Sequence, residues 1–176
     1  MVIFLIYCGE IFAGGFTHAN WIFANQIIKN VASYDFTSSY PYVMTTHKFP
    51  MSKFRKCYIK SAEDMINSFA YIVVVKFKNI KCKYYNNFIS LSKCRKIKNG
   101  KYDNGRVISA DEIEIALTDV DFKFLLKAYK CEYEIIESSF SRYDYLPKEF
   151  INFILDKYVL KTQYKNVAGK ELEYRS

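Results

Sequence analysis

The sequence predicts an α+β fold in which an antiparallel sheet packs against helices, and three observations lead to this class. Residues 71–77 form a run of β-branched and apolar residues that is typical of a buried strand. Residues 98–105 contain two Asn-Gly pairs, which are a strong signal for a hairpin between antiparallel strands. Helical patterns of apolar residues follow Thr118 and Pro147.

The composition is that of one globular domain. With 176 residues, of which 51% are hydrophobic, the chain can bury a core without disulfides or metals. Its longest uncharged stretch, around residues 11–26, is interrupted by Gly, Thr, His and Asn, and the N-terminus lacks a basic region and a cleavage site. We therefore expect no membrane segment and no secretion signal. Five cysteines without a C-x-x-C pair indicate reduced thiols in a cytosolic compartment.

The first part of the chain is expected to hold two strands. Residues 1–8 are apolar and predict a buried strand, and residues 33–38 alternate between apolar and polar. The second strand carries Asp35 and is expected to end in a turn at Tyr40 and Pro41.

The middle of the chain is expected to be rich in β-structure. Residues 61–69 predict a short helix, which the strand at residues 71–77 and a short strand at residues 86–90 follow. The Asn-Gly pairs at residues 98–105 close a hairpin, and residues 106–117 continue as a strand.

The last part is expected to be a helix, a strand and a helix. Thr118 fits an N-cap, because Asp119 and Asp121 then lie in the first turn, where the helix dipole favours anions. Residues 132–138 predict a strand, and Pro147 opens the second helix. The apolar positions expected to be buried are Val120, Phe124, Leu125 and Ala128 in the first helix, and Phe150, Ile151, Ile154, Leu155 and Tyr158 in the second.

The formal net charge of +8 has two explanations. Clustered lysines attract a polyanionic partner such as nucleic acid, but A/T-rich codon usage raises the lysine content without any such partner. Residues 65–102 contain no Asp or Glu, whereas residues 111–137 are acidic, which suggests one face or arm that meets phosphate. For Asp111, Glu112 and Glu114 we predict a solvated strand face opposite the basic segment rather than a metal site.

Asp35 and the turn after it carry the sharpest chemical signal. A carboxylate at the end of a strand is held rigidly and can bind a divalent cation, and the amides of the following turn can point at phosphate oxygens. The alternative from local features alone is an edge-strand Asp that caps a turn.

The whole string adds a resemblance to this local pattern. Asp35, Ser38, Tyr40 and Pro41 stand at the positions of motif A of the family B DNA polymerases, Asp-x-x-Ser-Leu-Tyr-Pro, with Ser39 in place of the usual Leu. The segment therefore resembles motif A of that family.

Three further segments resemble, in order, features of the protein-primed branch of this family, which occurs in phages, linear plasmids and organelles. Residues 12–17 resemble its Gly-Gly segment, residues 117–121 its Leu-Ser-Asn-Val-Asp segment, and residues 158–162 the helix that precedes motif B. The resemblance implies a partial polymerase palm, in which helices pack on an antiparallel sheet, and a small β-rich insertion.

The same resemblance implies three domain segments. Residues 1–60 would be the start of the palm, residues 61–117 a basic insertion with β-hairpins, and residues 118–176 a helix-strand-helix return towards the palm that stops before motif B.

It also implies roles for individual residues. Asp35 would coordinate two catalytic Mg²⁺ ions with the Phe36 carbonyl as a further ligand, and Tyr40 would stack under the incoming sugar. The other implied contacts are to a deoxynucleoside triphosphate at Phe36, Thr37, Ser38, Ser39 and Tyr40, and to DNA at Gly14, Gly15, Lys161, Thr162, Lys93, Arg95 and Lys96. The implied partners are the DNA template and primer and a terminal protein that primes synthesis.

The sequence lacks two motifs of the family and differs from it in one segment. Neither the Lys-x-x-x-Asn-x-x-Tyr-Gly of motif B nor the Asp-Thr-Asp of motif C is present, and Phe12 and Ala13 replace a Tyr-Arg pair. Because one carboxylate does not complete a two-metal site, we expect the isolated chain to be an inactive fragment of a DNA-directed DNA polymerase. The alternatives are one half of a split polymerase, a non-catalytic module that binds DNA or a terminal protein, or a decayed gene. The expected location is the cytoplasm of a host cell, with the mitochondrion as the alternative.

Overall fold

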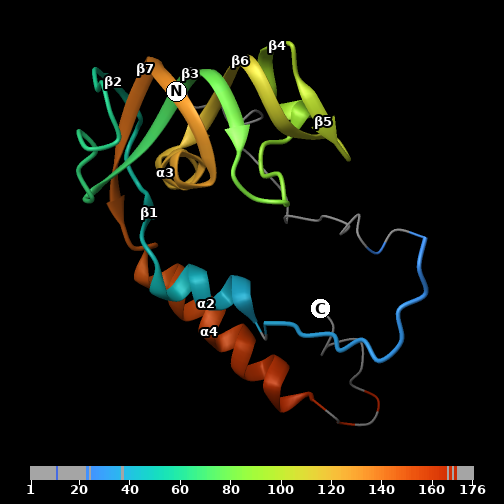
Figure 1. Ribbon diagram of the computed structural model, residues 1–176. Coiled ribbons are helices and arrows are strands. Elements are labelled where there is room, and N and C mark those ends of the chain that lie inside the picture. The colour runs from blue at the N-terminus through green and yellow to red at the C-terminus, as the bar shows by residue number, and fades with distance from the viewer. Residues whose placement is uncertain are drawn as a thin grey trace. The chain divides into compact units, whose positions relative to one another are not determined.

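The computed structural model describes residues 11, 23, 25–36, 38–165, 167 and 169, and it divides the chain into two compact units (Figure 1). The first unit contains residues 1–29 and 52–142, and the second contains residues 30–51 and 143–176. The strand predicted at residues 1–8 lies outside the described residues.

The chain combines helices with a sheet of antiparallel strands, so the predicted α+β class is confirmed. In chain order the elements are α2 (Ser39–Thr46), β1 (Phe49–Pro50), β2 (Arg55–Cys57), β3 (Phe69–Cys82), the 3-10 helix η2 (Leu91–Lys93), β4 (Cys94–Lys98), β5 (Lys101–Asp103), β6 (Arg106–Thr118), α3 (Asp119–Ala128), β7 (Tyr129–Asp144) and α4 (Lys148–Gln163).

The first unit is built on an antiparallel sheet in which β3 lies between β7 and β6, and β4 pairs with the far edge of β6. β2 adds to β7, and β5 adds to β6. The strands predicted at residues 71–77, 106–117 and 132–138 are confirmed, and each extends further than its sequence pattern indicated. Val73 and Val75 face the main core, whereas Ile72 and Val74 on the other face belong to a second small cluster with Ala116 and Phe54, which is why the apolar run at the centre of β3 does not alternate.

The hairpin predicted from the Asn-Gly pairs is confirmed at β5 and β6. Asp103 pairs with Arg106, and Asn104 and Gly105 between them have φ of 46° and 70°. Two consecutive positive φ values are those of a type I′ turn, whose twist matches that of the flanking strands.

The helix α3 begins as predicted. The Thr118 hydroxyl accepts a hydrogen bond from the Asp121 amide at 3.1 Å and donates one to the Asp121 carboxylate at 2.8 Å. The predicted buried face is correct only for Leu125 and Ala128. Phe122 is fully buried, whereas Val120 is 65% exposed.

The predicted position of Phe124 is also wrong, because its ring is half-exposed at the rim of the core. It packs edge-to-face on Phe88 with 4.9 Å between ring centroids. The apolar residues of α3 form two neighbouring faces of the helix, and the sequence is compatible with the burial of either one. The direction in which the helix crosses the sheet determines which face is buried.

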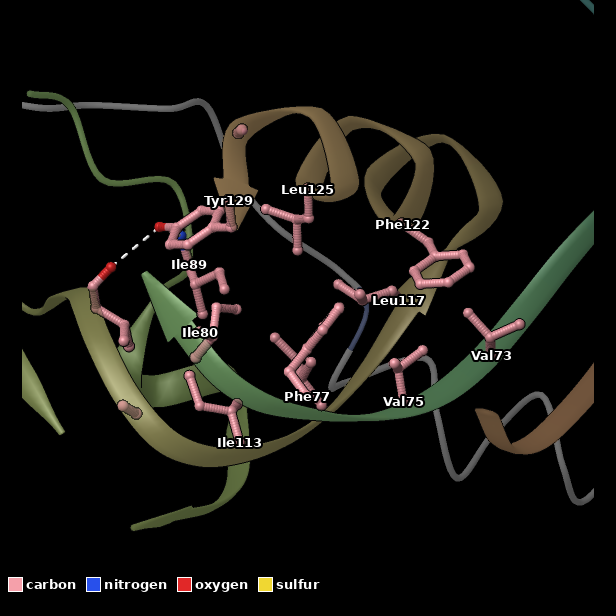
Figure 2. Close-up of a cluster of buried hydrophobic side chains, with 14 of the residues drawn as sticks. Val73, Val75, Phe77, Ile80, Ile89, Ile113, Leu117, Phe122, Leu125 and Tyr129 are labelled. Atoms are coloured by element: carbon pink, nitrogen blue, oxygen red, sulfur yellow. Dashed lines mark hydrogen bonds between the residues drawn. The ribbon is translucent and has the colours of Figure 1, made fainter. Parts of the chain in front are cut away.

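The main core lies between α3 and one face of the sheet (Figure 2). Val73, Val75 and Phe77 of β3 point towards Phe122 and Leu125 of α3. This face follows the odd-numbered residues of β3 as far as Phe77, as the alternation of a strand requires, and continues at Ile80 and Cys82 because the register of β3 against β7 shifts in this stretch.

Tyr129 anchors the loop between β3 and β4 to this core. Its hydroxyl donates to the Val107 carbonyl at 3.0 Å and accepts from the amides of Phe88 and Ile89 at 2.9 and 3.2 Å. Burial raises the pKa of Tyr129 to about 12. The strand predicted at residues 86–90 is wrong, because these residues form no ladder: Ser90 makes a single bridge to Arg106, and the Ile89 carbonyl accepts one hydrogen bond from the Val107 amide.

The helix predicted at residues 61–69 is also wrong. The Asp64 carboxylate accepts hydrogen bonds from the amides of Lys60 and Ser61 at 2.7 and 3.0 Å, which lower the pKa of Asp64. A side chain that satisfies the preceding amides in this way favours a turn over a helix, and residues 60–68 run as turns and bends.

The second unit contains α2, β1 and α4. Phe49 and Pro50 of β1 pair with Asp144 and Tyr143 at the end of β7, and α2 contacts α4 (Figure 1). The helix predicted after Pro147 is confirmed, but none of its described residues is buried. The predicted buried face is therefore wrong for the described part of the chain, where Ile151 and Ile154 are half-covered and the other predicted positions are exposed.

The four cysteines in the described residues, Cys57, Cys82, Cys94 and Cys131, are free thiols, in agreement with the prediction. Burial raises the pKa of Cys94 to about 11 and raises that of Cys131, so both stay protonated and unreactive near neutral pH. None of the helices in the described ranges is long and apolar enough to cross a membrane.

Candidate nucleotide and metal site

Asp35 lies in an extended segment of the second unit that forms no strand. Residues 31–36 make no ladder, and the flanking Tyr34 and Phe36 are 93% and 86% exposed. The predicted strand at residues 33–38 is wrong, because alternation of apolar and polar residues forms a strand only where a partner strand is available, and none is paired here in the described chain. Asp35 instead precedes the helix α2 by a few residues in sequence.

The turn expected after Asp35 is the N-terminus of α2. Ser38 is in the left-handed region with φ of 58°, and its carbonyl accepts the first helical hydrogen bond from the Tyr42 amide at 3.1 Å. No side chain caps this helix within the described residues. The amides of Ser39 and Tyr40 are therefore the first two of the helix and point out of its N-terminal end.

This arrangement can bind an anion. The N-terminal end of a helix carries a partial positive charge and offers unpaired amides, which together suit a phosphate group. Pro41 has no backbone N–H, so the donors come from Ser39 and Tyr40. The side chain of Tyr40 is 77% exposed beside them.

The hydroxyls in the last turn of α2 bond to the helix itself. Thr45 Oγ1 donates to the carbonyl of Pro41 at 2.9 Å, and Thr46 Oγ1 donates to that of Tyr42 at 2.6 Å. These side chains are satisfied by their own helix, which leaves the N-terminal end as the part of α2 with free donors.

The oxygen donors at Asp35 suit a hard divalent cation but do not complete a site. The Asp35 carboxylate and the Phe36 carbonyl are oxygen ligands of the kind that Mg²⁺ prefers. In the described ranges, no three His, Cys, Asp or Glu side chains gather closely enough to hold a metal ion. These two residues therefore fit a metal centre as contributors, and the remaining ligands would come from elsewhere.

Lys161 and Thr162 lie in the last turn of α4. The cation of Lys161 is placed there favourably for the helix dipole, and Thr162 Oγ1 donates to the Tyr158 carbonyl at 2.9 Å. Since α4 contacts α2, the fold brings residues more than a hundred positions apart into the same unit.

The other predicted DNA contacts lie in the first unit. Lys93 ends η2, and Arg95 and Lys96 are in β4. The Glu114 carboxylate of the neighbouring strand β6 forms ion pairs with Arg95 and Lys96. Lys96 Nζ lies 3.1 Å from Oε2, and Arg95 Nη1 lies 4.0 Å from Oε1. Glu112 and Glu114 face the basic segment as predicted, since Lys76 Nζ lies 3.1 Å from Glu112 Oε1, but the predicted solvation is wrong for Glu114, whose side chain is 18% exposed.

The sequence did not reveal how regularly these charges alternate. Across β7, β3, β6 and β4, residues in register carry alternating charge in two neighbouring rows, which we call the alternating rows. One row is Glu134, Lys76, Glu114 and Lys96, and the other is Glu132, Lys78, Glu112 and Lys98. Only the strand register brings these residues together, and the register is not readable from local sequence patterns.

Three predicted contact residues, Gly14, Gly15 and Thr37, lie outside the described residues. The structure therefore gives the environment of Asp35, Phe36 and Ser38–Tyr40 on the nucleotide side, and of the lysines, Arg95 and Thr162 on the DNA side.

Comparison with known families gives a match over nearly the full chain. The family model described as DNA polymerase type B, organellar and viral, matches residues 7–174. A comparison with curated protein sequences finds no match.

Among solved structures, the chain is similar to the DNA polymerase of phage phi29. Its complex with primer-template DNA and incoming nucleotide matches with a TM-score of 0.72 at 20% identity, over 92% of this chain and 28% of that one. The post-translocation complex with primer-template DNA matches with a TM-score of 0.52 at 18% identity, over 70% of this chain and 20% of that one. The chain thus shares the fold of a part of that polymerase and spans less than a third of its length.

Proposed function

Because the chain belongs to the organellar and viral type B DNA polymerases, we propose that it serves in template-directed addition of deoxynucleotides to a primer 3′-hydroxyl. The observation that carries this proposal is the segment around Asp35, in which a carboxylate precedes the uncapped N-terminus of α2 within a chain that matches the family over residues 7–174. The phi29 polymerase complex with DNA and nucleotide supports DNA and deoxynucleoside triphosphates as the partners.

In this proposal the residues near α2 handle the nucleotide. The amides of Ser39 and Tyr40 would bind triphosphate oxygens at the helix N-terminus, and the exposed ring of Tyr40 would lie against the sugar. Ser38 is left-handed, which turns the chain so that the helix starts directly after the metal-binding segment.

Asp35 and the Phe36 carbonyl would hold Mg²⁺ together with ligands from beyond the described residues. When bound there, Mg²⁺ would supply neutralisation of charge on the phosphates and activation of the primer hydroxyl. In this proposal the chain supplies two parts of the site from one short segment. These are the carboxylate of Asp35, which would bind the metal, and the N-terminus of α2, which would bind the phosphates.

The basic residues would serve DNA and the primer. We propose contacts to DNA or a terminal protein at Lys161 and Thr162 and to the template at Gly14 and Gly15. Lys93, Arg95 and Lys96 are further candidates, although Glu114 shares the charge of the last two. Priming by a protein is supported by the resemblance of residues 12–17, 117–121 and 158–162 to segments of the protein-primed branch.

The 176 residues contain one carboxylate that matches the metal ligands of the family, so we propose that they are not sufficient for synthesis. The test is Mg²⁺-dependent extension of a labelled primer-template by the purified chain, alone and with a companion polypeptide that carries motifs B and C. We expect no extension by the chain alone and extension by the pair. Asp35→Asn is expected to abolish the activity of the pair, and Asp156→Asn, an exposed carboxylate of α4, is the matched control.

Two results would contradict the proposal. Template-dependent extension by the chain alone would show that it holds a complete site. A pair that extends primers equally well with Asp35→Asn would show that Asp35 is not a metal ligand. DNA binding that survives Asp35→Asn in a chain no companion can activate would favour the non-catalytic binding module.

A further inference from the structure

A third row of charges lies next to the alternating rows on the sheet of the first unit. Lys130 of β7 stands opposite Lys81 of β3, Lys81 stands opposite Ser109 of β6, and Ser109 stands opposite Lys101 of β5. We call this set the lysine row. It crosses four strands at a spacing of about 4.8 Å, so it is about 14 Å long.

The lysine row is on the sheet face that points away from α3. Ile80 and Cys82, the neighbours of Lys81 in sequence, belong to the core on the α3 side. Tyr129 and Cys131, the neighbours of Lys130, belong to it as well. Because side chains of adjacent residues in a strand point to opposite faces, both lysines point the other way, and they are exposed.

The backbone of β3 is irregular immediately before Lys81. Asn79 has a φ of 50°, and the register of β3 against β7 shifts between Lys78 and Lys81. The shift is what allows Lys78 and Lys81, three residues apart, to share one face. A left-handed residue within a strand is unfavourable, and such irregularities commonly re-aim a side chain at a functional position.

The charge of the lysine row is not balanced as that of the alternating rows is. In the alternating rows each lysine has a glutamate in register, but in the described residues no carboxylate stands opposite a lysine of this row. Lys81, Lys101 and Lys130 make no ion pair there either. Like charges directly opposite each other in a sheet are destabilising, so an anion bound to Lys81 and Lys130 would relieve a repulsion that the fold leaves in place.

We propose that the lysine row binds backbone phosphates of nucleic acid. Three ammonium groups and the Ser109 hydroxyl form a line of donors, and lysines bind phosphate as point charges without reading the base sequence. The row has no apolar side chain that could anchor a peptide, which favours the uniformly charged backbone over an acidic protein segment. The inference rests on the proposed function, because DNA is the polyanion that a polymerase handles.

The test compares two variants of the full chain with equal loss of charge. In the row variant Lys81, Lys101 and Lys130 are replaced by Gln, and in the control Lys76, Lys78 and Lys98 of the alternating rows are replaced by Gln. Binding of a fluorescein-labelled primer-template duplex is measured by anisotropy at several NaCl concentrations. Each phosphate contact contributes about 0.9 to the slope of log affinity against log salt, so we expect the slope of the row variant to fall by about 2 to 3.

The slope of the control variant is expected to fall by less than about 1, because glutamates opposite its lysines already neutralise part of their charge. Equal slopes for the two variants, or a row variant that binds like the wild type, would overturn the lysine row while leaving the proposed function standing. A wild-type chain that does not bind the duplex would overturn both. Lys130→Gln alone, at an exposed position of β7, guards against misfolding of the triple variant and is expected to lower the slope by about 0.9.

Discussion

Lys96 and Glu114 stand opposite each other on the neighbouring strands β4 and β6, with Nζ 3.1 Å from Oε2. Lys96 is 74% exposed, whereas Glu114 is largely covered at 18% and also faces Arg95. The carboxylate thus holds two cations of the basic segment on the sheet, so part of the positive charge of this segment is already neutralised within the protein.

Glu114→Gln is expected to lower the free energy of unfolding by about 1 kcal/mol, because it removes the carboxylate from two ion pairs at a partly covered position. The same variant is expected to bind DNA more tightly at low salt, since Arg95 and Lys96 then lose their internal partner. Urea unfolding and the anisotropy assay measure the two effects. Asp156→Asn has the same change in charge at an exposed site and should change neither by a comparable amount.

Tyr129→Phe is expected to destabilise the first unit by about 2 to 3 kcal/mol. The variant keeps the ring but removes the hydroxyl that joins Val107, Phe88 and Ile89, and it leaves buried amides without an acceptor. Thermal unfolding followed by circular dichroism measures the loss. Tyr85→Phe, at a ring that is 82% exposed, should leave the midpoint unchanged, and an equal effect of the two variants would contradict the role of the hydroxyl.

Stability is expected to fall at alkaline pH through Tyr129. Burial raises the pKa of its phenol from 10.0 to about 12, so the folded state favours the protonated form more than the unfolded state does. The resulting stabilisation is fully present below about pH 10 and is lost as the pH rises through about 12. Unfolding in urea at pH values across this range measures the loss. Tyr129→Phe should flatten that part of the profile, and a profile that it leaves unchanged would assign the loss to other groups.

Gly105→Ala is expected to cost about 1 to 2 kcal/mol of stability, because a side chain in the left-handed region is strained. Gly105 has a φ of 70°, and no atom lies within 4 Å of the position that an added Cβ would take, so the cost is one of backbone conformation rather than of space. Asn tolerates this region better than Ala, and Gly105→Asn should therefore recover part of the loss. Chemical unfolding of the three proteins compares them, and equal stabilities would contradict the turn assignment.

Local signals predicted the elements whose partners are also local. The hairpin at Asn104 and Gly105, the N-cap at Thr118 and the apolar run in β3 each depend on a few adjacent residues, and each is confirmed. The errors arose where a distant partner decides. The segment around Asp35 alternates as a strand does but has no neighbouring strand in the described chain, and the face of α3 depends on how the helix crosses the sheet.

The candidate site could be predicted only as a set of residues. The order of its motifs identified the family, and that part is confirmed. The helix that begins at Ser39 was not predicted, because Tyr40 and Pro41 are equally typical of a turn. The pairing of Glu114 with two cations depends on the register of β4 against β6, which is shifted by an irregularity between Cys94 and Lys96, so local charge patterns could not predict it.

The hydroxyl of Tyr129 gives the loop between β3 and β4 an unexpected kinetic property. Residues 83–90 have little regular structure, and amides in such loops usually exchange their hydrogens with water within the dead time of the measurement. The amides of Phe88 and Ile89 donate to a buried oxygen, so their exchange requires that the core around Tyr129 open. Hydrogen exchange at these two amides would therefore report the opening of the sheet, and their exchange rates would be similar to those of amides in the central strand β3.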